Sequence, residues 1–112
     1  MINEEDKKFL LDLARRTIES KLAGKPLPEA FSENEELNRP CGAFVTLKIK
    51  GSLRGCIGNI QATIPLVETI SEMAVAASTR DPRFPPMSKD ELERADIEIS
   101  VLTPFEKVED PE

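Results

Sequence analysis

Apolar positions up to Gly24 recur at three- and four-residue steps, which predicts an amphipathic helix. Asn3 is a candidate N-cap for this helix, and the glycine predicts where it ends. Residues 25–40 are polar and contain prolines, so we expect a loop with at most one helical turn. Leu27 and Phe31 are the side chains that we expect to hold this loop against the domain.

Residues 41–60 alternate between aliphatic and polar side chains around a glycine, the pattern of a β-hairpin. Paired residues of an antiparallel hairpin share a face, so the loop length decides which side chains of the second strand join the core. A loop of even length would bury Arg54 without a partner, which is costly. We therefore expect the three-residue loop Lys50–Ser52, which places Leu53 in the core and turns Arg54 and Cys56 outward together.

This register has an electrostatic consequence on the outward side of the hairpin. It places Lys48 opposite Arg54 and Thr46 opposite Cys56. Like charges directly across a strand pair destabilise it, so we expect solvent, a carboxylate or an anionic ligand to compensate. Glu98, which points away from the core on the last predicted strand, is the carboxylate that we favour for this structural use over general acid–base catalysis.

The second half of the chain predicts two helices and a strand. A helix is expected over residues 65–79, with Thr63 as its cap, and it ends in the proline-rich segment 80–86. A capping-box pattern starts a short helix over 88–94, and clean alternation over 96–102 predicts a third strand. The fold class is therefore α+β, with a small antiparallel sheet packed by helices. Three strands make a thin sheet, so we expect further strands or a partner at an edge.

The residue types that are missing exclude several kinds of chemistry. The 112-residue chain has no His, which rules out Ser-His and Cys-His catalysis and imidazole metal sites within it. Its two cysteines are too few for a closed four-ligand zinc site, and we predict neither a metal nor a cofactor. A net charge of −6 and the absence of Trp and Tyr argue against nucleic-acid binding.

The ends and the apolar runs of the sequence bear on location. No apolar run approaches the about 20 residues that a membrane-spanning helix needs, so we expect no membrane segment. Residues 1–6 are acidic, whereas a secretory signal begins with basic and then apolar residues. We therefore expect a cytoplasmic protein.

Basic residues concentrate in the middle of the chain. Residues 39–86 hold six basic and three acidic side chains, whereas residues 87–112 hold three basic and nine acidic ones. A site for an anion is therefore expected in the middle segment. Arg54 and the Arg80-Asp81-Pro82-Arg83 loop could clamp a phosphate or a carboxylate. The structural alternative is that Arg80 pairs with Asp81 or another carboxylate and makes this loop a rigid corner.

Cys56 is the candidate nucleophile, because Arg54 and Lys48 could lower the pKa of its thiol. Gly55 and Gly58 leave space for a ligand to approach closely. The structural alternative is that Cys56 is a small half-buried residue and that the glycines form a bulge or admit a helix. With no His to act as a base, the sequence leaves open whether the protein is an enzyme.

Four segments of the chain carry a resemblance to a known family. The stretch Leu-Arg-Gly-Cys-Ile-Gly at residues 53–58 resembles the signature of the AMMECR family, whose microbial members are called AmmeMemoRadiSam system protein A. Residues 40–47, 78–84 and 97–102 match the same family in the same order. Members usually continue beyond this length, so we expect residues 1–112 to form a single AMMECR-like domain that is incomplete at its C-terminus.

The resemblance implies a function only in outline. It implies an α+β fold in two subdomains, an association with Memo-like proteins and radical-SAM enzymes, and the 53–58 stretch as the functional surface, without an assigned reaction. Our leading hypothesis is an accessory factor that binds a small anionic ligand or a protein partner through this hairpin face. The alternatives are a non-catalytic regulatory module that recognises protein or RNA, and a scaffold whose motifs only shape the fold. The candidate binding residues are Lys48, Arg54, Gly55, Gly58, Arg80, Asp81 and Arg83.

Overall fold

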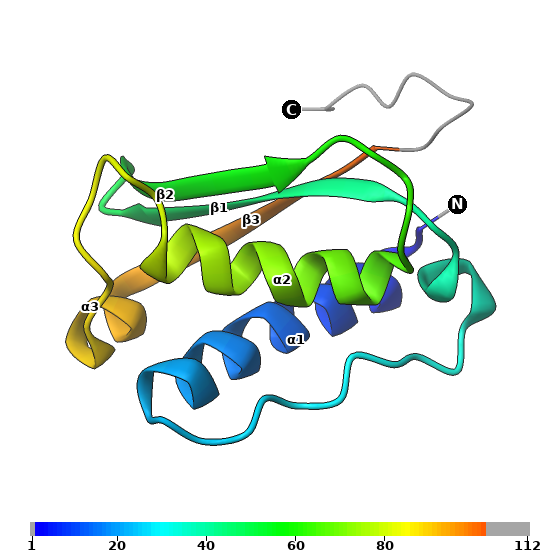
Figure 1. Ribbon diagram of the computed structural model, residues 1–112, viewed down its shortest axis with the longest axis horizontal. Coiled ribbons are helices and arrows are strands. Elements are labelled where there is room, and N and C mark those ends of the chain that lie inside the picture. Colours follow the sequence, from blue (N-terminus) through cyan, green and yellow to red (C-terminus); the bar gives the residue numbers. More distant parts are fainter. Residues whose placement is uncertain (1, 103–112) are drawn as a thin grey trace.

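A three-stranded antiparallel sheet and two long helices form two layers in the computed structural model, which describes residues 2–102 (Figure 1). The elements are α1 (Glu4–Leu22), the short 3-10 helix η1 (Glu35–Asn38), β1 (Gly42–Ile49), β2 (Ser52–Asn59), α2 (Leu66–Thr79), α3 (Lys89–Arg94) and β3 (Ala95–Leu102). The strand order is β2-β1-β3, and the α+β class predicted from the sequence is confirmed. The predicted domain also includes residues 1 and 103–112, which lie outside the described part of the chain.

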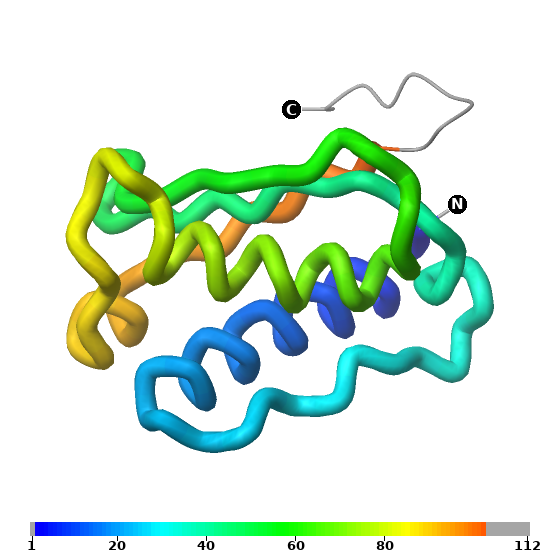
Figure 2. Tube along the Cα trace, in the orientation of Figure 1, coloured from blue at the N-terminus to red at the C-terminus, as the bar shows by residue number. Residues whose placement is uncertain are grey.

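Both long helices lie on the same face of the sheet and run in the same direction, so their C-terminal ends lie at the same end of the molecule (Figure 2). The core lies between the two layers. Its largest fully buried side chains in the two layers come from both long helices and the central strand, with Leu10 and Ile18 in α1, Val45 and Leu47 in β1, and Ile70 in α2. Within residues 2–102, no helix combines the length and the apolar character needed to cross a bilayer.

The helix ends agree with the sequence at two positions and differ at a third. Asn3 and Ser88 each accept a backbone hydrogen bond at the start of a capping box, as predicted for α1 and α3. The prediction that Thr63 caps α2 is wrong, because Pro65 occupies that place and makes no side-chain cap. Pro65 suits this position since the first turn of a helix has no partner for the missing N–H.

The loop between α1 and β1 is held by a different residue from those expected. Leu27 is 44% exposed and Phe31 is 57% exposed, so the prediction that they hold the loop against the domain is wrong. Leu37 in η1 is buried instead, because the single helical turn directs it into the core. The Asn34 side-chain amide donates to Asp6 Oδ1 at 3.0 Å, which joins this loop to the cap of α1.

The hairpin turn has two residues, not three. Lys50 and Gly51 both have positive φ, 52° and 79°, which is the requirement of a tight two-residue turn between antiparallel strands. The pairs next to the turn are Ile49 with Ser52 and Lys48 with Leu53. The predicted pairing of Lys48 with Arg54 is therefore wrong, and Leu53 is 40% exposed instead of joining the core.

A β-bulge then adds one extra residue to β2, and beyond it the side chains of β2 face the sides that a three-residue loop would have given them. The register shifts between Leu47 and Lys48, so that Leu47 pairs with Gly55 and Arg54 is the extra residue. From there on the pairing follows the prediction, with Thr46 opposite Cys56. The length of the loop and the bulge cannot be separated by alternation alone, because each changes parity by one residue.

Candidate functional site

Arg54 is buried and points toward α3 and the segment before it. Its Nε and Nη2 atoms donate to the two carboxylate oxygens of Glu91, each at 3.0 Å, and Nη2 also donates to the Pro85 carbonyl at 2.8 Å. The guanidinium carbon lies 5.6 Å from the centre of the Phe84 ring. The residue is 9% exposed, so the expectation that Arg54 turns outward together with Cys56 is wrong. A bidentate carboxylate offsets the desolvation that the sequence analysis treated as prohibitive.

Glu91 performs two tasks at once. Its carboxylate accepts from the Ser88 backbone N–H at 3.0 Å as part of the α3 capping box, besides binding Arg54. The hydrogen bonds from Arg54, followed by the one from the Ser88 N–H, lower the pKa of Glu91 to about 2. The side chain of Glu91 is 29% exposed. The cap signal of Glu91 is visible in the sequence, but its partner lies 37 residues away and carries no local signal.

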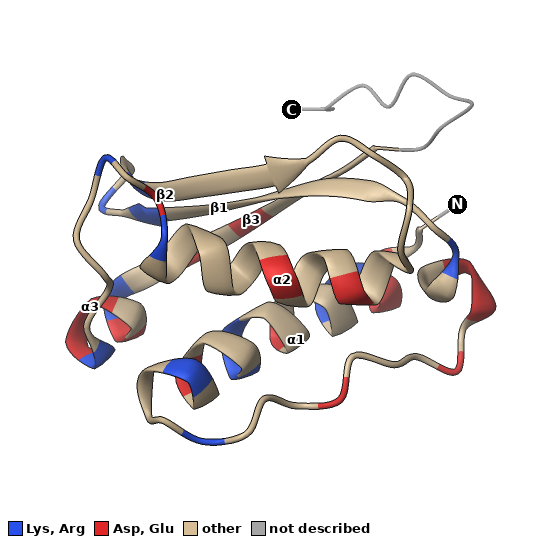
Figure 3. Cartoon of the chain, viewed as in Figure 1, with Lys and Arg blue, Asp and Glu red and all other residues tan. Residues whose placement is uncertain are grey.

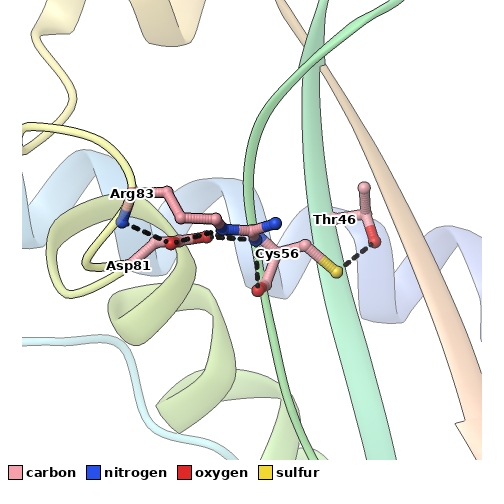
Figure 4. Close-up of polar contacts among 4 residues, drawn as sticks. All are labelled: Thr46, Cys56, Asp81 and Arg83. Atoms are coloured by element: carbon pink, nitrogen blue, oxygen red, sulfur yellow. Dashed lines mark hydrogen bonds and ion pairs between the residues drawn. The ribbon is translucent and has the colours of Figure 1, made fainter.

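Asp81 and Arg83 bind the backbone of β2 at Cys56 (Figure 4). The Cys56 N–H donates to Asp81 Oδ2 at 3.0 Å, and Arg83 Nη2 lies 3.4 Å from the Cys56 carbonyl oxygen, to which it donates. Since β2 is an edge strand among those described, these side chains occupy backbone groups that a further strand would otherwise use. The loop between α2 and α3 therefore caps this edge of the sheet.

The Asp81–Arg83 pair is itself held by several contacts. Arg83 donates to Asp81 from its backbone N–H, from Nε and from Nη2, at 3.0, 3.0 and 2.7 Å. Asp81 is 4% exposed. The Arg83 side chain, followed by its backbone N–H, holds the pKa of the Asp81 carboxyl well below its usual range, and the same side-chain contact raises the pKa of Arg83. The alternative in which Arg80 pairs with Asp81 is wrong, because Arg83 is the partner.

Phe84 links these two arrangements. Its ring centre lies 5.6 Å from the Arg54 guanidinium carbon and 5.5 Å from that of Arg83. Both cations therefore share one aromatic ring as well as having a carboxylate each. No pattern in the sequence predicts Phe84 or Glu91 as a partner of these arginines.

The remaining outward side chains of the strands share the face of the sheet that α1 and α2 do not cover (Figure 1). We call this the outer face, and the register places on it Gly42, Phe44, Thr46, Lys48, Leu53, Cys56, Gly58, Asp96, Glu98, Ser100 and Leu102. Cys56 Sγ lies 3.2 Å from Thr46 Oγ1, and its thiol is free and half-buried. Lys48 Nζ lies 3.3 Å from Glu98 Oε2, so Glu98 pairs with Lys48 as expected, but there is no repulsion between Lys48 and Arg54 for it to offset, because those two residues are not paired.

The two glycines of the 53–58 stretch make room for other parts of the chain. A Cβ atom on Gly55 would collide with the carbonyl oxygen of Ala77, because α2 lies directly against β2 there. A Cβ atom on Gly58 would collide with the ring of Phe44, which lies over it across the strand pair. The space that the sequence analysis considered for a ligand is thus filled by a helix backbone and an aromatic ring.

Arg80 lies apart from the other candidate residues. It is exposed at the C-terminal end of α2, where it lines a hollow together with Lys21 and Lys25. The predicted site therefore divides into three parts. The first is the arginine cluster, which consists of Arg54 and Arg83 with their partners Glu91, Asp81 and Phe84. The other two are the exposed Lys48–Glu98 pair on the outer face and Arg80 by itself. Within residues 2–102, no three Cys, Asp or Glu side chains converge closely enough to hold a metal ion.

Comparison with known proteins identifies relatives over nearly the whole chain. A model of the AMMECR1 family matches residues 11–112. A protein of Methanothermobacter thermautotrophicus is 40% identical over 115 residues, which cover 96% of this chain and 57% of that protein. Protein MK0488 of Methanopyrus kandleri is 46% identical over 108 residues, which cover 94% of this chain and 52% of that protein.

A solved structure shares the fold. The crystal structure of protein PH0010 from Pyrococcus horikoshii matches with a TM-score of 0.87 and 40% identity, over 98% of this chain and 57% of that chain. The chain therefore spans a little more than half the length of these relatives.

Proposed function

This chain belongs to the AMMECR1 family, and we propose that it is an accessory binding protein that recognises a protein partner through the outer face of its sheet. The proposal assigns binding to this face and no reaction to Cys56. The thiol has Thr46 as its neighbour, and a hydroxyl group is not a base that could activate it at neutral pH.

The observation that carries the proposal is the contrast between the two faces of the sheet. One face is covered by α1 and α2, whereas no helix within residues 2–102 covers the other. The centre of the outer face holds the half-buried side chains of Phe44, Thr46 and Cys56, an aromatic ring and two small polar groups. A polypeptide with apolar and small polar side chains is the partner that this centre fits.

The pairing of the basic residues argues against the small-anion hypothesis at this place. Arg54 is bound by Glu91, Arg83 by Asp81 and Lys48 by Glu98. An anion would have to displace a carboxylate to reach any of them. A phosphate-rich partner such as RNA meets the same obstacle, because its affinity depends on unpaired cations.

The family resemblance names the first partners to test. Memo-like proteins and radical-SAM enzymes are the proteins with which microbial members are associated, so we propose them as ligands of the outer face. In such a complex this chain would position or recruit the partner, and the chemistry would belong to the other protein.

The experiment compares two arginine substitutions on opposite sides of the molecule. Thr46→Arg places a long cation at the centre of the outer face, whereas Phe31→Arg places one on the exposed loop beyond the helices. Binding of the chain to a purified Memo-like protein and to a radical-SAM protein from the same source is measured by calorimetry. We expect Thr46→Arg to reduce the affinity at least tenfold and Phe31→Arg to leave it unchanged, with equal thermal stability of both variants.

Alkylation of Cys56 gives a second readout that does not depend on a substitution. A partner that covers the outer face should slow the reaction of Cys56 with iodoacetamide. Equal losses of affinity in both variants, or unchanged alkylation in a saturated complex, would contradict the proposal. Binding of random RNA at low salt with a linear dependence of log affinity on log salt would favour the RNA alternative instead.

A further inference from the structure

A hollow lies at the C-terminal ends of α1 and α2, away from the outer face. Its volume is about 700 Å³, within the range of small-molecule sites. Residues from the last turn of α1, from the loop that follows it and from α2 line it. Figure 3 shows basic residues at this end of both helices.

The rim of the hollow carries three basic side chains, Lys21, Lys25 and Arg80, and one acidic side chain, Glu72. None of the three cations forms an ion pair with a described residue, whereas Arg54 and Arg83 each have a carboxylate. The carbonyl ends of two helices add roughly half a negative charge each. The balance is about one positive charge, which suits a ligand with a single negative charge better than a polyphosphate.

Ser71 adds a polar group inside the hollow. It is 9% exposed and lines the wall, and its hydroxyl has no hydrogen-bond partner within residues 2–102. The other hydroxyls of α2 are all satisfied. Thr69 Oγ1 donates to the Cys41 carbonyl at 3.0 Å, and the hydroxyls of Ser78 and Thr79 donate to carbonyls of the preceding turn at 2.8 and 2.7 Å. The Ser71 hydroxyl is open to the hollow, so a ligand there can accept a hydrogen bond from it in place of water without breaking a contact within the protein.

The rest of the wall is largely apolar and comes from Pro26, Leu27, Met73, Val75 and Ala76. Leu27 is 44% exposed, so a ligand in the hollow would remove apolar surface from water. We infer that this hollow binds a small organic monoanion, a carboxylate with an apolar body of a few carbons. The cationic rim holds the carboxylate, Ser71 donates to it, and the apolar wall takes the body.

The test uses two probes of equal size and opposite charge. Sodium hexanoate is titrated into the ¹⁵N-labelled chain, and hexylammonium chloride into a second sample. Hexanoate should shift the amide signals of Gly24, Ser71 and Ala76 in a saturable manner and leave those of Thr46 and Ile57 in place. Hexylammonium should shift none of the first group.

Two variants and one control locate the binding. Lys25→Glu reverses one rim charge, and Lys8→Glu makes the same change on a part of α1 that does not line the hollow. We expect Lys25→Glu to weaken hexanoate at least fivefold, Ser71→Ala to weaken it about threefold, and Lys8→Glu to leave it within twofold.

Several outcomes would overturn the inference. The first is that hexanoate shifts no amide signal up to 20 mM, a concentration on the order of a weak fragment's Kd. The second is that hexylammonium shifts the same signals equally. The third is that Lys25→Glu and Lys8→Glu change the affinity for hexanoate equally. The Ser71→Ala result separates a built site from a general attraction of anions to lysines. If that variant binds hexanoate as the natural chain does while Lys25→Glu does not, only charge is recognised and the site is wrong.

Discussion

The arginine cluster and the hollow at the helix ends both contain basic side chains, but those of the cluster are paired with carboxylates and those of the hollow are not. In the cluster, Arg54 and Arg83 each contact a carboxylate and share the Phe84 ring. In the hollow, Lys21, Lys25 and Arg80 face solvent without an acidic partner among the described residues. The two regions are joined through the short segment between Arg80 and Arg83, so their difference does not come from local composition.

This difference separates two uses of positive charge. A buried arginine with a bidentate carboxylate fixes how three segments pack, and removing its partner leaves a charge without solvent or ligand. An unpaired cation on the rim of a hollow contributes little to stability and is available to a ligand. Whether a cation is paired therefore says more about binding than how many cations a segment holds.

The largest expected effect is on the buried partner of Arg54. Glu91→Ala leaves this guanidinium with one carbonyl and removes half of the α3 capping box, so we expect the free energy of unfolding to fall by about 3 kcal/mol or more. Glu93→Ala in the same helix is the control, because that side chain is exposed. Urea unfolding measures both, and equal small losses would mean that the Arg54–Glu91 pair does not hold α3 against β2.

The pH dependence of stability should reveal the same carboxylate. Its pKa in the folded chain is about 2 against an ordinary 4.5, so the folded state favours the ionised form. This contribution is complete above pH 4.5 and is lost as the pH falls toward 2, reaching a loss of about 2 kcal/mol at pH 3. Asp81, whose pKa is also lowered, acts in the same direction.

Thermal unfolding between pH 7 and 2.5 measures this loss, and Glu91→Gln supplies the comparison. The variant cannot titrate at this position, so its melting temperature should fall less steeply than that of the natural chain below pH 4.5. Parallel curves would show that other carboxylates account for the acid sensitivity.

A matched pair of arginine variants compares the cluster and the hollow directly. Arg83→Gln removes the side chain that neutralises buried Asp81, and we expect a loss of about 1–2 kcal/mol. Arg80→Gln makes the same change three residues earlier and should alter stability by less than about 0.5 kcal/mol. The ratio of the two losses in urea unfolding is the decisive measurement. Similar losses would remove the distinction between paired and free cations on which the proposed carboxylate site in the hollow depends.

The sequence was sufficient for the order of elements and for most of the register. The caps of α1 and α3, the alternation of the strands and the Thr46–Cys56 pairing are local signals and are found as predicted, whereas the predicted Thr63 cap of α2 is not. The hairpin register failed at Arg54 because a two-residue turn followed by a bulge has the same parity as a three-residue loop. The alternation of side chains shows only whether the number of residues between two strands is odd or even. It does not show whether the extra residue lies in the turn or in a bulge.

The candidate site was harder to predict from the sequence than the fold, because the positions of its side chains depend on partners that lie far away in the chain. Arg54 was expected outward on the argument that an unpaired buried arginine is too costly. Arg54 is not unpaired, however, since its partner Glu91 comes from a helix whose approach to β2 no local pattern reveals. Arg80 and Arg83 are three residues apart, yet Arg80, the C-cap of α2, lines a hollow, whereas Arg83, in the loop that follows, binds the backbone of β2.

The smallest expected effect concerns the ion pair on the outer face. The side chains of Lys48 and Glu98 are 37% and 57% exposed, so water screens their attraction even though Nζ and Oε2 lie 3.3 Å apart. A double-mutant cycle with Lys48→Gln and Glu98→Gln should give a coupling energy of no more than about 0.5 kcal/mol, and less at 1 M salt. The same cycle for Arg54→Gln and Glu91→Gln should give a coupling several times larger, because burial removes the screening. A strong coupling would mean that the Lys48–Glu98 ion pair is held as rigidly as the Arg54–Glu91 pair. A partner would then have to break the Lys48–Glu98 pair to dock over Cys56.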